Sequence, residues 1–283
     1  MLIEQRVFNV RVLVASTQDI ASQTISKVLI EEHGFQESGS SFEGSPVYSL
    51  GNSALLITTS RDMIFANHLE QHFEAQVFVF CSRHRAQSGR PALLVHSTGN
   101  FGADASFGGA PEQLSISTAS LVSTALRRLK IERDQRSMEE FDVTLEVTHH
   151  GPTSMNTPML FIELGSDESH WRNMDGARTV AAAALDCIRA PFQHEASIGF
   201  GGTHYASKFN KLVLERNARI GHLAPKYALD DMSPSLVHQM ISRSKESVAR
   251  AIIDWKGTNA QQKERLFPIL EDCGLEVIRA SRV

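Results

Sequence analysis

The chain has 283 residues, of which 42% are hydrophobic and 21% are charged, and this balance is typical of a folded globular protein. Its formal net charge of −4 excludes a global preference for polyanions, so a nucleic-acid partner would have to bind a local basic patch. The three well-separated cysteines, Cys81, Cys187 and Cys273, exclude a disulfide framework and a cysteine-built zinc site, and they favour a reducing compartment.

The start of the chain and its apolar runs predict no membrane segment. Glu4, Arg6 and Arg11 interrupt the apolar start, which therefore lacks the apolar block of a signal peptide. No apolar run approaches the roughly 20 residues that cross a bilayer. We therefore expect a cytoplasmic protein that makes no membrane contact.

Apolar runs typical of strands alternate with helical patterns along the chain. The first pair is a predicted strand at residues 7–15 and a helix that Ser16 or Thr17 caps and Gly34 ends. The Ser- and Gly-rich segment 37–46 is expected to be a loop. Further strands are predicted at residues 54–59, 77–81, 92–96, 141–148, 159–164, 196–200 and 275–280. Further helices are predicted at residues 114–130, 175–188, 234–244 and 261–272.

This alternation predicts the fold class. Strands that alternate with helices imply an α/β fold with a mixed, largely parallel sheet and helices on both faces. The sequence contains no internal repeat and no low-complexity linker. We therefore expect residues 1–283 to form a single compact α/β catalytic unit, within which the sequence does not delimit a small α/β subdomain.

Histidine is the residue type that stands out, with 12 copies against three tyrosines and two tryptophans. Imidazole titrates near neutral pH and binds metals, so an excess of it indicates site chemistry. Functional side chains of α/β sheets gather where strands end, and four predicted strands end at or just before His84, His96, His150 and His204. We infer one shared site. Other histidines are expected to be surface or structural residues: His33, His68, His72, His194 and His238.

Two carboxylates and a second histidine lie close to these positions. Adjacent side chains on a strand point to opposite faces, so at most one of His149 and His150 is expected in the site if the strand geometry persists, and we select His150. A charged residue in an apolar strand needs a partner, for which a histidine or a metal is suited. Glu163 is the stronger candidate for the site carboxylate, because Glu146 could instead face solvent on an edge strand.

Such residues permit two kinds of hydrolytic site. Two or three imidazoles with one carboxylate can hold zinc, which activates a bound water, although the spacing matches no local zinc signature. A metal-free alternative uses one histidine as general base, with Asn100 or backbone amides as oxyanion donors. Gly201 and Gly202 would let a substrate approach the backbone closely and would supply free amides that bind an oxyanion, unless they serve only to form a turn.

Basic residues occur in two clusters. Arg83 and Arg85 lie beside the proposed site and are expected to bind phosphates of a nucleic acid. Residues 127–133 contain Arg127, Arg128, Lys130 and Arg133, which are expected to form a solvated helix end, because cations complement the helix dipole there.

Seven motifs in this order together resemble the archaeal and plant type of D-aminoacyl-tRNA deacylase, and they cover nearly the whole chain. They are Ser-Arg-His at 82–84, His-Ser-Thr-Gly-Asn at 96–100, Thr-His-His-Gly-Pro-Thr at 148–153, Phe-Ile-Glu-Leu-Gly-Ser at 161–166, Gly-Phe-Gly-Gly-Thr-His-Tyr at 199–205, Gly-His at 221–222 and Asp-Trp-Lys-Gly at 254–257.

The resemblance implies hydrolysis of the ester that joins a D-amino acid to tRNA. The products are the free D-amino acid and free tRNA, and the reaction serves chiral proofreading. It also implies Zn²⁺ and a phosphorylase/hydrolase-like α/β fold. Carried over by position, the implied site is His84, His96, His150, Glu163 and His204, and motif matching does not divide it into metal ligands and proton-transfer residues. We expect His84, His96, His150 and Glu163 to bind the metal. Catalytic roles are assigned to His150, His204, Glu163 and Asn100. Substrate binding is assigned to Arg83, Arg85, Gly201, Gly202 and Tyr205.

Two other functions could use the same residues. A zinc-dependent peptidase or amidohydrolase would cleave small substrates without tRNA, and it would not need Arg83 or Arg85. A non-enzymatic RNA-binding module would keep its function after substitution of His150 or His204. We expect a monomer, because the chain has no long apolar stripe beyond its core patterns.

Overall fold

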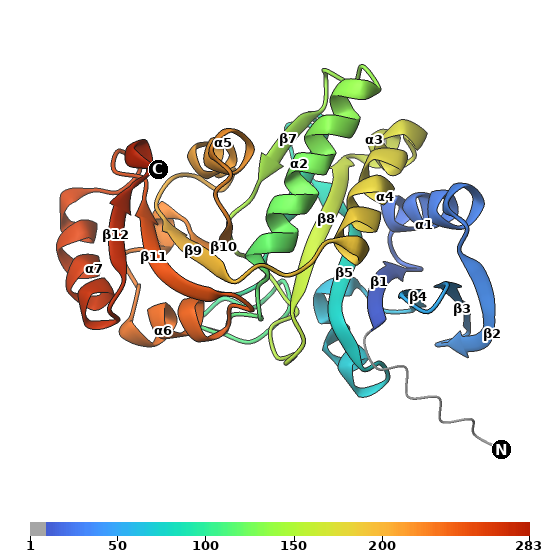
Figure 1. Ribbon diagram of the computed structural model, residues 1–283, viewed down its shortest axis with the longest axis horizontal. Coiled ribbons are helices and arrows are strands. Elements are labelled where there is room, and N and C mark those ends of the chain that lie inside the picture. Colours follow the sequence, from blue (N-terminus) through green and yellow to red (C-terminus); the bar gives the residue numbers. More distant parts are fainter. Residues whose placement is uncertain (1–9) are drawn as a thin grey trace.

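The computed structural model describes residues 10–283, which form two sheets (Figure 1). The larger sheet has the strand order β2-β3-β4-β1-β5-β8-β6-β7, and the smaller sheet has the order β10-β9-β11-β12. The strands of the larger sheet are β1 (Val10–Ser16), β2 (Gln36–Phe42), β3 (Ser45–Leu50), β4 (Ala54–Thr59), β5 (Ala75–Arg85), β6 (Ala92–His96), β7 (Asp142–Leu145) and β8 (Met159–Ser166). The strands of the smaller sheet are β9 (Glu195–Phe200), β10 (Ile220–Ala224), β11 (Ser247–Ile253) and β12 (Glu276–Arg279).

Helices connect most of the strands. The α-helices are α1 (Ile20–His33), α2 (Ala119–Gln135), α3 (Glu168–Trp171), α4 (Met174–Arg189), α5 (Ser207–Arg216), α6 (Pro234–Ser242) and α7 (Ala260–Asp272). The 3-10 helices are η1 (Met63–Gln71), η2 (Lys226–Ala228) and η3 (Ala280–Arg282). The cap of α1 is Asp19, which accepts a hydrogen bond from Ser22 N, and not Ser16 or Thr17. Gly34 ends α1 in the left-handed conformation, as expected.

The larger sheet is mixed and largely parallel, which confirms the predicted α/β class. β1 runs parallel to β4 and β5, and β5 runs parallel to β8. β6 is antiparallel to β8, and the hairpin of β2 and β3 adds two further antiparallel pairings. The smaller sheet is parallel throughout.

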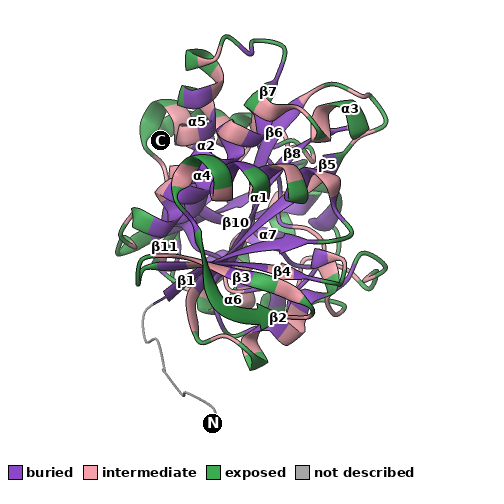
Figure 2. Ribbon diagram, turned by 90° about the vertical axis from the view of Figure 1, so that its right-hand side faces the viewer, coloured by how far each residue is buried: buried purple, intermediate pink, exposed green. Residues whose placement is uncertain are grey.

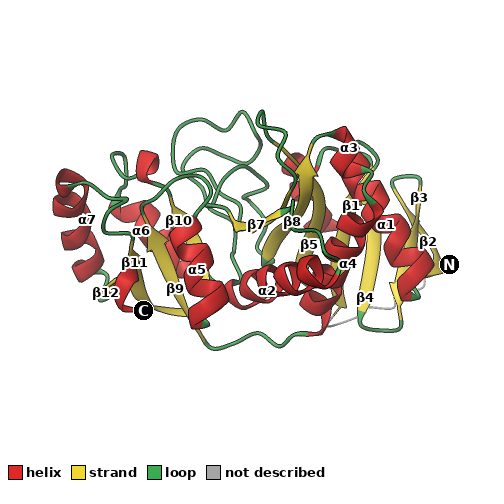
Figure 3. Ribbon diagram, turned by 90° about the horizontal axis from the view of Figure 1, so that it is seen from above, coloured by secondary structure: helices red, strands yellow, loops and turns green. Residues whose placement is uncertain are grey.

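The long helices α1, α2 and α4 cover one face of the larger sheet, and loops lie along the other (Figure 3). The helix-covered face buries Leu13 and Ile162, whereas the opposite face buries Phe80 and Phe161 under η1. In the smaller sheet, α6 and α7 pack on one face and α5 on the other. The strands of both sheets are mostly buried, while the outer sides of the helices are exposed (Figure 2). The loop-covered face of the larger sheet is therefore the one on which a site can open.

Not all predicted elements are correct. The strands at 54–59 and 92–96 are confirmed at their predicted bounds. The start of the predicted strand 7–15 lies outside the described residues. The expected loop at 37–46 is instead a hairpin, because Glu43 and Gly44, with φ of 48° and 82°, form its turn. β10, β11 and α5 were not predicted from the sequence. Within residues 10–283, no helix combines the length and apolar character needed to cross a membrane.

Candidate active site

Glu163 lies in the middle of β8, on the sheet face that the long helices leave uncovered. Alternate residues of a strand share a face, so Phe161, Glu163 and Gly165 point to the same side. His96 of β6 pairs with Phe161, and His84 of β5 pairs with Gly165. A Cβ at Gly165 would come within 2.7 Å of the His84 Cβ, so this glycine provides the space that His84 needs.

The histidines were expected to meet beyond the carboxyl ends of parallel strands, but they do not. Because β6 is antiparallel to β8, the carboxyl ends of β5 and β6 lie at different levels of β8. Glu163 lies between these levels and contacts both rings. His84 Nδ1 is 3.3 Å from Glu163 Oε2, and His96 Nε2 is 3.6 Å from Glu163 Oε1. The site therefore lies across the face of the sheet.

These three buried groups determine one another's charge. Burial by itself raises the pKa of Glu163, but His84 and His96 outweigh burial and hold this pKa well below its usual range. Burial lowers the pKa of both imidazoles, yet their contacts with Glu163 and the charge of Glu146 outweigh it, so the pKa of each is raised. Ser82 Oγ also donates to Glu163 Oε1 over 2.8 Å, and the carboxylate is therefore fixed in place.

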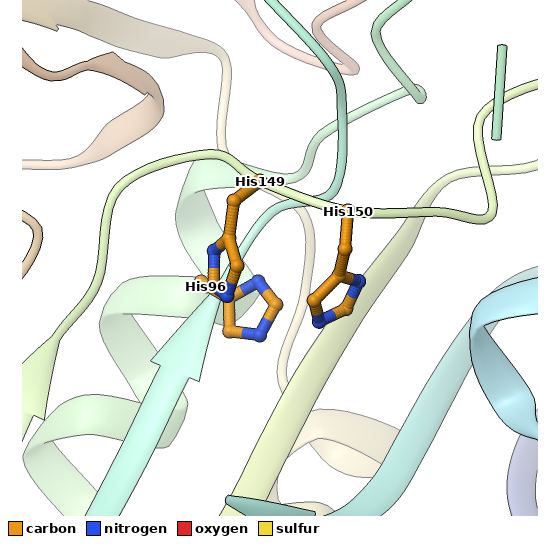
Figure 4. A group of neighbouring side chains, drawn as sticks. All are labelled: His96, His149 and His150. Atoms are coloured by element: carbon orange, nitrogen blue, oxygen red, sulfur yellow. The ribbon is translucent and has the colours of Figure 1, made fainter. Parts of the chain in front are cut away.

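His149 and His150 both enter the site from one loop (Figure 4). Their ring centroids lie 4.2 Å and 4.8 Å from that of His96. The prediction that at most one of them enters is wrong, because the strand geometry does not persist. His150 has a φ of 44°, and this left-handed residue turns the chain so that both rings face His96.

The three rings share one pattern of hydrogen bonding. The Nδ1 atoms of His96, His149 and His150 face backbone carbonyl oxygens, at 3.1 Å, 2.8 Å and 2.6 Å. Since a carbonyl only accepts, Nδ1 of each ring carries a proton, and Nε2 of His149 and His150 is left with its lone pair in the neutral ring. Metal-binding histidines are oriented in this way.

Burial also keeps two of these rings neutral. It lowers the pKa of His149 well below its usual value, and the neighbouring histidines lower it further. Burial, followed by the charge of His96, lowers the pKa of His150 to about 4. Neutral imidazole is the form that binds metals.

Glu146 belongs to the site and does not face solvent. Its side chain is 0% exposed, and its Oε1 lies 3.1 Å from His204 Nε2 and 3.7 Å from His84 Nδ1. β7 ends at Leu145, one residue before Glu146, which instead forms an isolated bridge with Tyr205. This bridge brings the loop that carries His204 to the carboxylate.

The clustered side chains form three groups whose ligand atoms lie within 4.8 Å of one another. The groups are His96, His149 and His150; Glu146, His149 and His204; and His84, Glu146 and Glu163. The predicted metal ligands are therefore divided between the first and third groups. The prediction omitted His149 and Glu146, although each occurs in two groups. Within the described residues, His96 Nε2 and Glu146 Oε2 are buried without a hydrogen-bond partner, and such atoms are unfavourable unless something binds them.

Asn100 has a different role from the expected oxyanion donor. Its Nδ2 donates to the carbonyl oxygens of Gly108 and Ala110, at 2.9 Å and 3.1 Å. Both amide hydrogens are thereby used, because an amide nitrogen carries two. Asn100 holds the loop that borders the site.

The amides of Gly201 and Gly202 are not free either. They donate to the carbonyl oxygens of Ala224 and Gly257, at 2.8 Å and 3.1 Å. A Cβ at Gly201 would lie 2.3 Å from Thr258 Oγ1, so this glycine is required for close packing of two loops. The structure thus explains the glycine pair by packing and not by oxyanion binding.

The remaining predicted residues lie around the cluster. Tyr205 Oη is 3.1 Å from His84 Nε2. Arg83 donates to the carbonyl oxygen of Gln18 and to Asp62, whereas the exposed guanidinium of Arg85 has no ion pair within residues 10–283. On α2, Arg128, Lys130 and Arg133 are paired with acidic residues of the same helix, for example Arg128 with Glu132 at 2.7 Å, as expected of a solvated helix. Arg127 differs, because its Nε donates to the carbonyl oxygen of Val213 over 3.1 Å.

A cavity of about 780 Å³ opens onto the cluster. It is large enough for a small organic ligand. Its lining includes the catalytic candidates His84, His149, His150, Glu163 and His204. The rim includes Arg83, Arg85, Asp62, Phe107, Tyr227 and Asp231. Imidazoles and carboxylates at the floor of such a cavity can bind a divalent metal, activate water and transfer protons.

Comparisons with known proteins show the family of this chain. A sequence model of the D-aminoacyl-tRNA deacylase family matches residues 71–278. The chain is 36% identical to the D-aminoacyl-tRNA deacylase of Thermococcus onnurineus over 278 residues, covering 95% of this chain and 99% of the relative. It is 34% identical to that of Pyrococcus furiosus, with coverage of 95% and 99%. A crystal structure described as a conserved protein of unknown function is similar with a TM-score of 0.89 at 30% identity, covering 97% and 96% of the two chains. The chain therefore belongs to the D-aminoacyl-tRNA deacylase family of hydrolases.

Proposed function

We propose that this chain hydrolyses the ester of D-aminoacyl-tRNA and releases the free D-amino acid and tRNA. One observation carries the proposal: a buried cluster of imidazoles and carboxylates lies at the floor of the 780 Å³ cavity in a chain of this family. An aminoacyl ester is already reactive. The enzyme therefore has to position water, provide a base and reject the L-isomer.

We propose zinc as the metal, because the donor atoms suit it. His96, His149 and His150 would hold it through Nε2, while each Nδ1 is held by a backbone carbonyl. The buried Nε2 of His96, which has no hydrogen-bond partner in the described chain, supports this assignment. When bound, zinc supplies a water whose pKa is near neutrality.

Glu146 and His204 are suited to move the proton. A carboxylate only accepts hydrogen bonds, so Glu146 holds the proton of His204 on Nε2, 3.1 Å away. His204 Nδ1 is then left with its lone pair, on a ring that lines the cavity. There it can take a proton from the attacking water and return it to the leaving ribose oxygen.

Arg85 is suited to hold the tRNA backbone. It lines the cavity, and it has no competing ion pair within residues 10–283. Arg83 lies beside it but is engaged with Asp62 at 3.2 Å. We therefore assign phosphate binding to Arg85 first. That the enzyme acts as a monomer in the cytoplasm stays a prediction from the sequence.

Deacylation assays with D-tyrosyl-tRNA and L-tyrosyl-tRNA test this function. We expect rapid release of D-tyrosine, slow release of L-tyrosine, and loss of activity after removal of metal with a chelator. Equal turnover of the two isomers would exclude proofreading, and full activity after thorough metal removal would exclude zinc. Cleavage of small dipeptides without any tRNA deacylation would support the peptidase alternative.

A further inference from the structure

Exposed aromatic side chains gather at the cavity. Five large hydrophobic side chains are exposed within the described residues: Phe65, Phe107, Ile131, Tyr205 and Tyr227. The two most exposed, Phe107 at 69% and Tyr227 at 62%, both line the cavity. Tyr205 contacts His84 inside the site. A soluble domain gains nothing in stability from leaving such rings in water, so their gathering at one cavity indicates a ligand.

Phe107 is held beside the histidine loop by its backbone. Its carbonyl oxygen accepts a hydrogen bond of 3.0 Å from Gly151 N, and Gly151 directly follows His150. The next residue is packed so tightly that a Cβ at Gly108 would lie 2.1 Å from Ile64 O. The ring is therefore exposed while its attachment point is fixed, which is a suitable arrangement for a stacking platform.

Tyr227 is positioned from the other side of the cluster. Its hydroxyl lies 3.3 Å from His204 Nδ1, so the far end of the side chain reaches the proposed base. Its ring remains mostly exposed at the rim. Phe107 is thus attached beside the loop that carries His150, and the hydroxyl of Tyr227 lies 3.3 Å from His204 Nδ1.

We propose that Phe107 and Tyr227 bind the adenine base at the 3′ end of the tRNA by stacking. This inference rests on the proposed function. An ester bound at the histidines places the terminal ribose beside them, and the adenine attached to that ribose then lies further out in the cavity. Aromatic rings bind bases through their faces, and Arg85 on the same cavity can contact the adjoining phosphate. The enzyme would then recognise the terminal nucleoside that all tRNAs share, and not the sequence of any one tRNA.

Binding of adenosine 5′-monophosphate, measured by calorimetric titration, tests the stacking directly. Wild type is expected to bind it and to bind ribose 5-phosphate far more weakly. Phe107→Ala should weaken binding by about tenfold or more, whereas Phe107→Trp and Tyr227→Phe, which keep a ring, should retain it. Ile131→Ala, an exposed apolar residue outside the cavity, is the matched control. No nucleotide binding by wild type, or equal binding by Phe107→Ala, would overturn the proposal.

A second comparison separates the base from the amino-acid side chain as the occupant. The loss of kcat/KM in Phe107→Ala should be at least about tenfold greater with D-tyrosyl-tRNA than with D-tyrosine methyl ester, which has no base. Equal losses with both substrates would mean that the ring contacts the amino acid, and the proposal would be wrong. If wild type binds the nucleotide through Phe107 but deacylates neither isomer, the proposed reaction fails while the base site stands.

Discussion

The imidazole rings of His96 and His149 lie with their centroids 4.2 Å apart, although 53 positions separate them in the sequence. Backbone pairing brings them together: Thr98 and His149 form an isolated bridge, and Gly99 N donates to His150 O over 2.8 Å. The rings themselves are not needed to hold this geometry. The His149 imidazole can therefore be removed to test its chemistry while these backbone contacts remain.

Substitution of His149 is expected to reduce the bound metal. His149 belongs to two of the three ligand groups, so His149→Ala should lower the zinc content of the purified protein well below that of wild type. Elemental analysis after dialysis measures this. The matched control is His238→Ala, an exposed histidine on α6, which should bind as much zinc as wild type. Unchanged zinc in His149→Ala would mean that the metal is held elsewhere.

Gly201→Ala is expected to destabilise the fold. The new Cβ would lie 2.3 Å from Thr258 Oγ1 at a residue whose φ is +98°. We expect the free energy of unfolding in urea to fall by about 1–3 kcal/mol. Gly39→Ala separates the two causes, because Gly39 has a φ of +80° but open space around it. The free energy of unfolding should fall less in Gly39→Ala than in Gly201→Ala. An equal decrease in the two variants would show that packing against Thr258 contributes nothing.

Glu43→Gln is expected to destabilise the fold in a pH-dependent way. Glu43 accepts hydrogen bonds from Thr59 Oγ1 at 2.8 Å and Ser60 N at 2.6 Å. Burial by itself raises the pKa of Glu43, but these hydrogen bonds outweigh it and lower the pKa to about 2. A carboxyl group whose pKa is lower when folded stabilises the fold above its unfolded pKa, and this contribution is lost as the pH falls through the folded pKa.

The variant should therefore be less stable than wild type by about 1–2 kcal/mol at pH 7. The difference should shrink as the pH falls from about 4.5 towards 2, the range between the unfolded and folded pKa. Urea unfolding at several pH values measures it. Glu74→Gln, at an exposed carboxylate, is the control and should behave as wild type throughout. A constant difference across this range would contradict the assigned pKa.

Arg85→Ala is expected to weaken tRNA binding in a salt-dependent way. If Arg85 contacts one phosphate, its removal should raise KM for D-aminoacyl-tRNA and lower the slope of log KM against log salt by about one unit. Arg128→Ala is the control, because Arg128 is paired with Glu132 on α2. A slope equal to that of wild type would place Arg85 outside the tRNA contact.

Much of the fold was predictable because its strands are short apolar runs between polar turns. β4 and β6 match their predicted bounds for this reason. β2 did not show this pattern, since it is an exposed edge strand of Ser, Gly and Glu without buried alternation. β10 is interrupted by Gly221 and His222 in the sequence, yet all five of its residues are buried. Tertiary packing, which the local pattern does not encode, decides both cases.

The site was only partly predictable. Histidines after apolar runs indicated His84, His96, His150 and His204 correctly as neighbours of one cavity or cluster. His149 was excluded by strand alternation, which the left-handed conformation of His150 breaks. The direction of β6 could not be read from residues 92–96, so the expected meeting point at one sheet edge was wrong. Long-range pairing determines both features.

The deacylation of D-aminoacyl-tRNA by wild type and by His149→Ala, measured side by side, shows whether the buried histidine and carboxylate cluster performs this hydrolysis. Wild type is expected to release the D-amino acid, and His149→Ala should do so at least about 100-fold more slowly while unfolding at the same urea concentration. A folded His149→Ala variant that deacylates D-aminoacyl-tRNA at the wild-type rate would contradict this role of the cluster.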